Sequence, residues 1–109
     1  MEEKSEFGEY LKKLIKQAGM TQTEFYTRWG IKKPYFYDII GGRVSPPPYP
    51  LQYKAVEILH VDDKTRELFF DIAAKGRKEL PADIAEAVYE NPIVLKNIRK
   101  NLSKLASSN

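Results

Sequence analysis

Apolar residues recur every three or four positions along most of the 109-residue sequence, and this spacing constrains the fold more than any other feature. In the first such segment they are Phe7, Leu11, Leu14, Ile15 and Ala18. The spacing places these side chains on one face of an α-helix. Gly19 follows the segment and is expected to end the helix. Similar patterns continue to the end of the sequence, which therefore predicts an all-α fold.

Two short helices are predicted next. Thr21 and Glu24 fit the capping box, in which a threonine and a glutamate bond to the backbone where a helix begins. Gly30 is expected to end this helix, and Pro34 suits the first turn of the following one. Two short helices joined by a tight turn that contains glycine form a helix-turn-helix, here over about residues 22–42.

The second helix of this unit has two faces. Phe36, Ile39 and Ile40 share one face and can pack inward, whereas Lys33 and Tyr37 point away from it. The ordinary interpretation is a core helix with a solvated outer face. The helix-turn-helix context favours the alternative, an outer face that contacts another molecule.

The spacing of the two helices resembles that of the lambda-repressor and Cro-like (XRE) family of DNA-binding proteins. The residues that carry the resemblance are Met20-Thr21-Gln22, Phe25-Tyr26, Gly30-Ile31, Phe36, Ile39, Gly42-Arg43 and Pro46. The similarity covers about residues 5–74 and implies a five-helix lambda-repressor-like DNA-binding domain. The chain departs from the family at Tyr26, where a small residue is usual, and at Ile40, where a glutamate is usual. Tyr26 is expected either to crowd the two helices or to swing outward.

The resemblance implies that the second helix enters the major groove and reads base edges. The base-reading residues are expected to be Lys32, Lys33, Pro34, Tyr35, Tyr37 and Asp38. Lysine can donate to guanine, aspartate can accept from cytosine, and ring edges can touch a thymine methyl group. Lys33 is the first candidate. Asp38 can instead cap the helix or pair with Arg43 or Lys33, and Tyr35 can instead be partly buried.

Phosphate contacts are expected from Gln22, Gly41, Gly42 and Arg43. By the resemblance, Gln22 corresponds to a phosphate-binding glutamine, and the free amides and dipole at this helix start favour an anion. The two glycines let the backbone approach a phosphate, and Arg43 adds a positive charge. The glycine pair equally fits a left-handed helix stop, and the two roles are compatible.

Two more helices are expected before residue 75. The first should bury Leu51, Ala55, Ile58 and Leu59, and the second Leu68, Phe69, Ile72 and Ala73. Asp62-Asp63 can cap the second of them. The preceding run Pro46-Pro47-Pro48-Tyr49 matches the PPxY type of WW-domain ligand, although a stiff connector is the favoured interpretation.

The family pattern ends at about residue 75, where Lys75-Gly76-Arg77-Lys78 is predicted to be a hinge or loop. Two further helices are predicted to begin near Pro81 and Pro92. The resulting division is a DNA-binding domain at 1–74 and a C-terminal helical extension at 75–109.

The last predicted helix carries an apolar stripe with spacings of 3, 4 and 3. Its members are Leu95, Ile98, Leu102 and Leu105. We expect this a/d seam to form a homodimer, because two copies related by a two-fold axis can read half-sites roughly 34 Å apart. The alternative is that the stripe folds back on the first five helices and completes one core.

Composition limits the remaining classes of function. The sequence has no cysteine, and its one histidine, His60, has no second ligand or nucleophile in a recognisable motif. No paired-carboxylate motif or phosphate-binding glycine loop is present, so we expect no enzyme activity, cofactor, metal or small-molecule ligand. No apolar run approaches the roughly 20 residues of a membrane span, and the acidic start at residues 1–6 is unlike a signal peptide. These features predict a cytoplasmic protein with no membrane partner.

The net charge of +3 permits a polyanionic partner without requiring one. We expect a sequence-specific double-stranded DNA-binding transcriptional regulator. It should be a repressor that occupies an inverted-repeat operator as a homodimer, because the chain has no room for a sensing or self-cleaving domain. The alternative is a protein-interaction module, antitoxin-like or adaptor, that uses Tyr35, Tyr37 and Tyr49. The positive charge around the second helix of the motif favours DNA.

Overall fold

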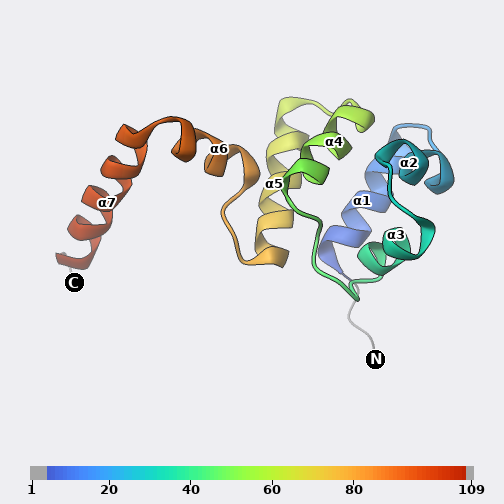
Figure 1. Cartoon of the computed structure of the whole chain (residues 1–109), viewed down its shortest axis with the longest axis horizontal. Coiled ribbons are helices and arrows are strands. Elements are labelled where there is room, and N and C mark those ends of the chain that lie inside the picture. The colour runs from blue at the N-terminus through green and yellow to red at the C-terminus, as the bar shows by residue number, and fades with distance from the viewer. Residues whose placement is uncertain (1–4, 108–109) are drawn as a thin grey trace.

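The computed structural model describes residues 5–107, which form seven α-helices and no strand (Figure 1). The helices are α1 Glu6–Gln17, α2 Gln22–Trp29, α3 Lys33–Ile40, α4 Tyr49–Leu59, α5 Asp63–Arg77, α6 Ala82–Glu90 and α7 Pro92–Ser107. The predicted all-α class is confirmed. The first four residues of the acidic start, 1–4, lie outside the described residues. Within residues 5–107, none of the helices combines the length and apolar character needed to cross a membrane.

Short-range sequence signals explain where several helices begin and end. The Thr21 hydroxyl accepts a hydrogen bond from the Glu24 amide at 3.0 Å, and the Glu24 carboxylate accepts from the Thr21 backbone, which confirms the capping box. Gly30 ends α2 with φ of 80°. Asp62 accepts a hydrogen bond from the Thr65 amide at 2.8 Å at the start of α5. Hydrogen bonding from Thr65 holds the pKa of Asp62 below its usual value, because it favours the charged carboxylate.

The core is built around α1, which packs against α3 and α5, while α2 packs against α4 (Figure 1). Its largest buried side chains include Phe25, Trp29, Phe36, Phe69 and Phe70. The Trp29 indole N–H donates to the Leu51 carbonyl at 2.7 Å, so the side chain that fills the space between α2 and α4 also has its polar atom satisfied. Full burial of a large apolar side chain contributes about 1.5–3 kcal/mol, so these aromatic residues supply a substantial part of the stability of the core.

The buried faces of α4 and α5 differ from those predicted. In α4 the buried residues are Gln52, Ala55, Val56 and Leu59. Leu51 and Ile58 are only half-buried, and in α5 Leu68 is exposed while Phe70 and Ala74 are buried. The reason is that α4 and α5 each pack against several helices, so the stripe that each helix buries is turned by about one residue from the predicted stripe, toward these neighbours.

The predicted hinge at residues 75–78 is wrong, because α5 continues through Gly76 to Arg77. Lys78 ends the helix in the left-handed region, with φ of 58°. A Cβ atom at Gly76 would lie 2.7 Å from Cγ of Pro46. The glycine therefore allows the loop after α3 to pack closely on α5 and does not mark a flexible joint.

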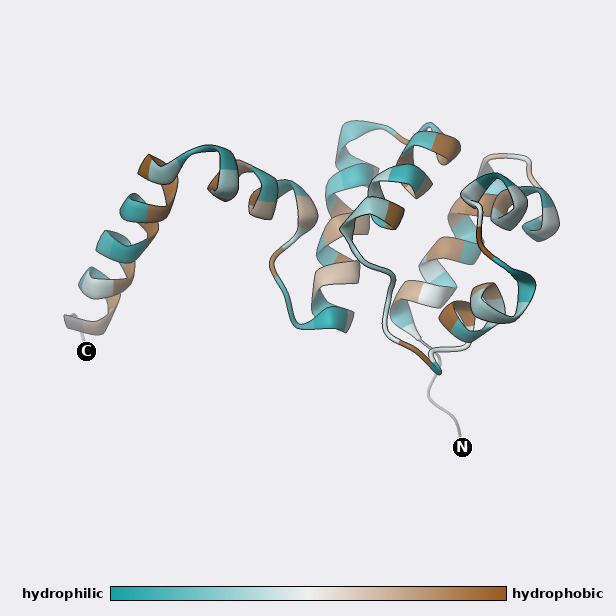
Figure 2. Cartoon of the chain, in the orientation of Figure 1, coloured by the Kyte–Doolittle hydropathy of each residue, from teal (hydrophilic) through white to brown (hydrophobic). Residues whose placement is uncertain are grey.

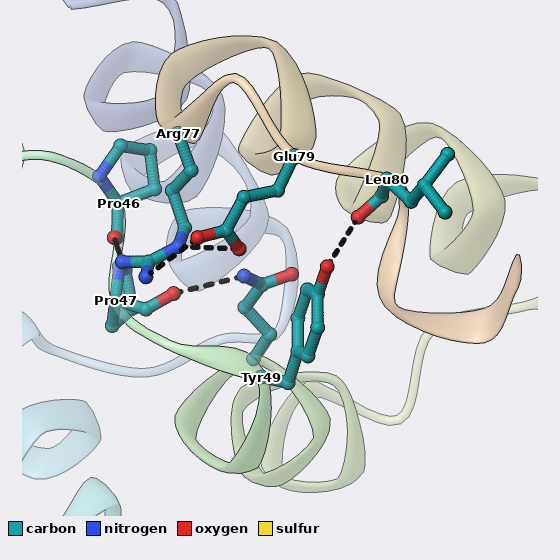
Figure 3. Close-up of polar contacts among 7 residues, drawn as sticks. Pro46, Pro47, Tyr49, Arg77, Glu79 and Leu80 are labelled. Carbon is teal, nitrogen blue, oxygen red and sulfur yellow. Dashed lines mark hydrogen bonds and ion pairs between the residues drawn. The ribbon is translucent and has the colours of Figure 1, made fainter. Parts of the chain in front are cut away.

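Polar contacts join this loop to the start of the C-terminal extension (Figure 3). The Arg77 guanidinium donates to the Pro46 carbonyl at 2.8 Å and forms an ion pair with Glu79 at 3.1 Å. Its hydrogen bond to Glu79 holds the pKa of that carboxyl below its usual value. The Tyr49 hydroxyl donates to the Leu80 carbonyl at 2.8 Å. The extension therefore begins on the loop that follows the helix-turn-helix.

The proline run is part of the folded body. Pro46 and Pro47 are buried, and the side-chain amide of the buried Gln52 donates to the Pro47 carbonyl at 2.8 Å. Tyr49 is already the first residue of α4. These positions agree with a stiff connector and leave the first two prolines inaccessible to a WW domain.

Helix α6 docks on α4 and α5, and α7 projects beyond it (Figure 1). The Tyr53 hydroxyl donates to the Glu86 carboxylate at 2.5 Å and fixes α6 on α4. Burial, together with this hydrogen bond, raises the pKa of Tyr53 to about 12. The apolar stripe of α7 is exposed in all four members, Leu95, Ile98, Leu102 and Leu105. It does not complete the core of the first five helices, contrary to the alternative expectation.

Candidate nucleic-acid interface

The outer face of α3 carries most of the predicted base-reading side chains. These are Lys33, Pro34, Tyr37 and Asp38, which lie on the side of the helix away from the buried residues. Phe36 and Ile39 are fully buried against the core, and Ile40 is half-buried. One face of α3 therefore anchors the helix and the opposite face stays open to a partner.

The N-terminal end of α3 is positively charged. Lys32 occupies the capping position and makes no side-chain capping hydrogen bond, and Lys32, Lys33 and Pro34 are all exposed. The first-turn amides of a helix and its dipole also favour negative charge at this end. The lysines and the helix end consequently attract the same kind of ligand, an anion.

The tyrosines of the motif are less open than the lysines. Tyr35 is half-buried against the core, as the alternative expectation for it allowed, and Tyr37 is 38% exposed with its ring edge-on to Phe36 at 5.4 Å. Tyr26 does not swing outward. It is half-buried and packs on Phe36 at a ring separation of 5.3 Å, which fills the space between α2 and α3.

Two predicted DNA-contact residues bind each other. The Arg43 guanidinium donates to the Asp38 carboxylate at 2.8 Å and to the Tyr37 carbonyl at 2.8 Å. Arg43 thus adds a second hydrogen bond to a carbonyl that already accepts from the Gly41 amide, and Asp38 has the ion-pair partner considered as an alternative to base contact. Both side chains are partly exposed, and such surface pairs contribute about 1 kcal/mol or less. The pair can therefore open when a competing ligand approaches.

The expected phosphate-binding residues occupy two separate places. Gln22 is half-buried at the first position of α2, whereas Gly41, Gly42 and Arg43 follow α3. Gly42 has φ of 74°, and a Cβ there would lie 2.8 Å from Cβ of Ser5. The turn and the close approach of Ser5 therefore explain Gly42 as a helix stop, while both glycines remain exposed.

An open hollow of about 740 Å³ beside Arg43 was not predictable from the sequence. It lies between the start of α1, the loop after α3 and the end of α5, where Lys75 pairs with Glu6 at 3.4 Å. Local patterns report contacts within one or two helical turns and give no sign that Lys75 lies near Arg43. Within residues 5–107, no three His, Cys, Asp or Glu side chains are grouped so that they could hold a metal ion.

Comparison with known protein families, curated proteins and solved structures finds no match to this chain. The residues and geometry of this surface are therefore the basis for a functional proposal.

Proposed function

We propose that the chain is a sequence-specific double-stranded DNA-binding regulator of the lambda-repressor-like (XRE) type. The observation that carries the proposal is the two-sided α3, with Phe36 and Ile39 buried and Lys33, Pro34 and Tyr37 open to a partner. A helix anchored along one side and exposed along the other can enter the major groove of B-DNA.

The individual residues have different roles in this proposal. Lys33 donates to the acceptor atoms of a guanine, and Lys32 reinforces the attraction at the same helix end. Gln22 at the start of α2 and Arg43 after α3 contact phosphates on either side of the groove. Arg43 makes its phosphate contact after it leaves Asp38, since the guanidinium is shared with that carboxylate in the free protein.

We also propose that the protein is cytoplasmic, acts as a homodimer and represses by occupying an inverted-repeat operator. Helices α3 and α7 lie at opposite ends of the molecule (Figure 1). DNA reading and dimerisation can therefore proceed on separate surfaces. The exposed stripe of α7 supplies the dimer seam, with Leu95, Ile98, Leu102 and Leu105 as its members.

A protein-interaction module remains the second candidate, because Tyr37 and Pro34 expose an aromatic and an apolar ring on α3. Tyr35 and Tyr49 are half-buried, so the tyrosine surface is smaller than the sequence suggests. The exposed lysines at the start of α3 favour a polyanion over a protein partner.

The deciding experiment is selection of random double-stranded DNA by the purified protein at about 150 mM salt, a concentration that weakens contacts made to phosphates alone. We expect enrichment of a short inverted repeat by the wild type and none by Lys33→Glu. Lys13→Glu is the matched control, since Lys13 is exposed on α1 and the change of charge is the same.

Circular dichroism and thermal melting of both variants accompany the selection. Unchanged folding of Lys33→Glu, together with lost enrichment, supports base reading by α3. Weak and uniform recovery of DNA by all three proteins would overturn the DNA proposal. In that case the same face of α3 would be tested for a protein partner.

A further inference from the structure

Exposed apolar side chains are concentrated in the C-terminal part of the described chain. Eleven large hydrophobic side chains are exposed, and eight of them belong to residues 80–105. The ribbon of α7 is mostly hydrophobic along the edge turned toward the rest of the molecule and mostly hydrophilic along its outer edge (Figure 2). Contiguous exposed apolar surface of this kind marks an interaction site.

A groove of about 380 Å³ lies beside this surface, between α6 and the start of α4. It is lined by Tyr49, Glu79, Leu80, Ala85, Val88 and Tyr89. The Tyr49 hydroxyl is already bonded to the Leu80 carbonyl and the Glu79 carboxylate to Arg77, so these two polar side chains that line the groove have partners (Figure 3). The groove therefore suits an apolar side chain better than a polar one.

The chain's own α7 cannot lie back along α6 to fill this groove. Helix α6 ends at Glu90 and α7 begins at Pro92, so Asn91 is the only residue between them. An antiparallel pair of helices needs a connection of about 2–5 residues. The groove is therefore open to a helix of another molecule.

The charges of the two helices are complementary. Helix α6 carries the acidic residues Asp83, Glu86 and Glu90 and no basic residue. Helix α7 carries the basic residues Lys96, Arg99, Lys100 and Lys104 and no acidic residue. A second α7 is repelled by the first through these charges, whereas α6 attracts it.

We propose that the groove beside α6 receives α7 of a second copy, and that two copies exchange their α7 helices reciprocally. The inference rests on the homodimer of the proposed function and adds the groove in which α7 of the other copy binds. The α7 helix of the second copy runs antiparallel to α7 of the first copy. Its end that carries Leu102 lies near Val88 and Tyr89 of the first copy. A two-fold axis makes both contacts equivalent, so neither groove is left empty.

Sedimentation without DNA tests the groove through two neighbouring positions on α6. Val88→Glu places a charge in the groove, and we expect the dimer dissociation constant to rise by roughly 100-fold or more. Ala87→Glu is the matched control, because Ala87 is exposed and does not line the groove, and it should leave the dimer intact. Equal dimerisation of the two variants and the wild type would overturn the exchange.

Disulfide trapping tests the same arrangement without adding a charge to α6, because Tyr89 lines the groove, is 88% exposed, and the sequence has no native cysteine. A mixture of Tyr89→Cys and Leu102→Cys should give the mixed disulfide. A mixture of Tyr89→Cys and Lys100→Cys should give no mixed disulfide, because Lys100 lies on the side of α7 opposite Leu102.

The trapped products also separate this proposal from the proposed function. Pairing of Leu102→Cys only with itself would overturn the exchange and leave a simple α7 dimer standing. A monomeric wild type would overturn the exchange and the dimer together. DNA selection by the same wild-type sample reports on the DNA proposal independently of these results.

Discussion

At the scale of single residues, the charge on the candidate DNA surface depends on which partner Asp38 takes. In the structure its carboxylate binds Arg43, so these two charges largely cancel. The positive charge of α3 then comes mainly from Lys32 and Lys33. A cytosine amino group or a phosphate can compete for the two paired side chains, because the pair is partly exposed and weak.

Asp38→Ala tests whether the carboxylate reads a base. We expect the preferred DNA sequence to stay the same and the affinity to rise by up to roughly fivefold, because Arg43 no longer has to leave Asp38 before it contacts its phosphate. Fluorescence anisotropy at a fixed salt concentration measures the affinity. Asp71→Ala, an exposed acid on α5, is the control for the change in net charge. Relaxed preference at one base pair would instead assign a base contact to Asp38.

At the scale of helices, the sequence predicts ends better than faces. Thr21, Glu24 and Gly30 act on backbone atoms within one turn, so their effect is visible in the local sequence. Gly76 is different, because its role is to admit Pro46, which is far away in the sequence. The pattern around Gly76 therefore suggests a hinge where the folded chain has a continuous helix.

In the candidate site, too, some features follow from the local sequence and others depend on contacts with distant residues. The exposure of Lys33 and the burial of Phe36 follow from helical periodicity alone. The half-burial of Tyr35 depends on the helices around it, and the groove beside α6 depends on how α6 docks on α4. Neither feature has a local signal, so periodicity predicts which face of α3 is exposed and does not predict the groove proposed to bind α7.

The packing of α1 against α3 gives a prediction for the helix pair. A Cβ atom at Gly8 would overlap the backbone carbonyl of Ile40, so Gly8→Ala must push α3 away from α1. We expect the free energy of unfolding to fall by about 1–3 kcal/mol, as for other overpacked sites. Urea denaturation measures the change. Lys13→Ala, on the exposed side of α1, should stay within about 0.5 kcal/mol of wild type, and an equally small effect at Gly8 would contradict the close packing.

At the scale of the whole molecule, the positions of α3 and α7 bear on how a dimer could hold DNA. The molecule measures 50 × 34 × 21 Å, and these two helices lie at opposite ends of its longest dimension (Figure 1). A two-fold axis near α7 and parallel to this dimension places the two α3 helices side by side at the far end. Half-sites one DNA turn apart are separated by roughly 34 Å, which is the distance that the two α3 helices must then span.

Leu102→Asp tests whether α7 holds the two copies together. Leu102 is 58% exposed in the single chain, so the substitution should leave the fold of each copy intact. In the dimer it buries an unpaired charge, and we expect sedimentation to shift from dimer to monomer. Asn101→Asp introduces the same charge at the neighbouring exposed position and should remain dimeric.

Binding to two DNA probes then separates dimerisation from base reading. Leu102→Asp should lose affinity for the full inverted repeat and keep the wild-type affinity for a single half-site, because α3 is unchanged at the other end of the molecule. A Leu102→Asp protein that still sediments as a dimer would exclude the α7 seam. Equal loss on both probes would mean that α7 supports the reading domain itself, since a dimer contact has no effect on a half-site bound by one copy.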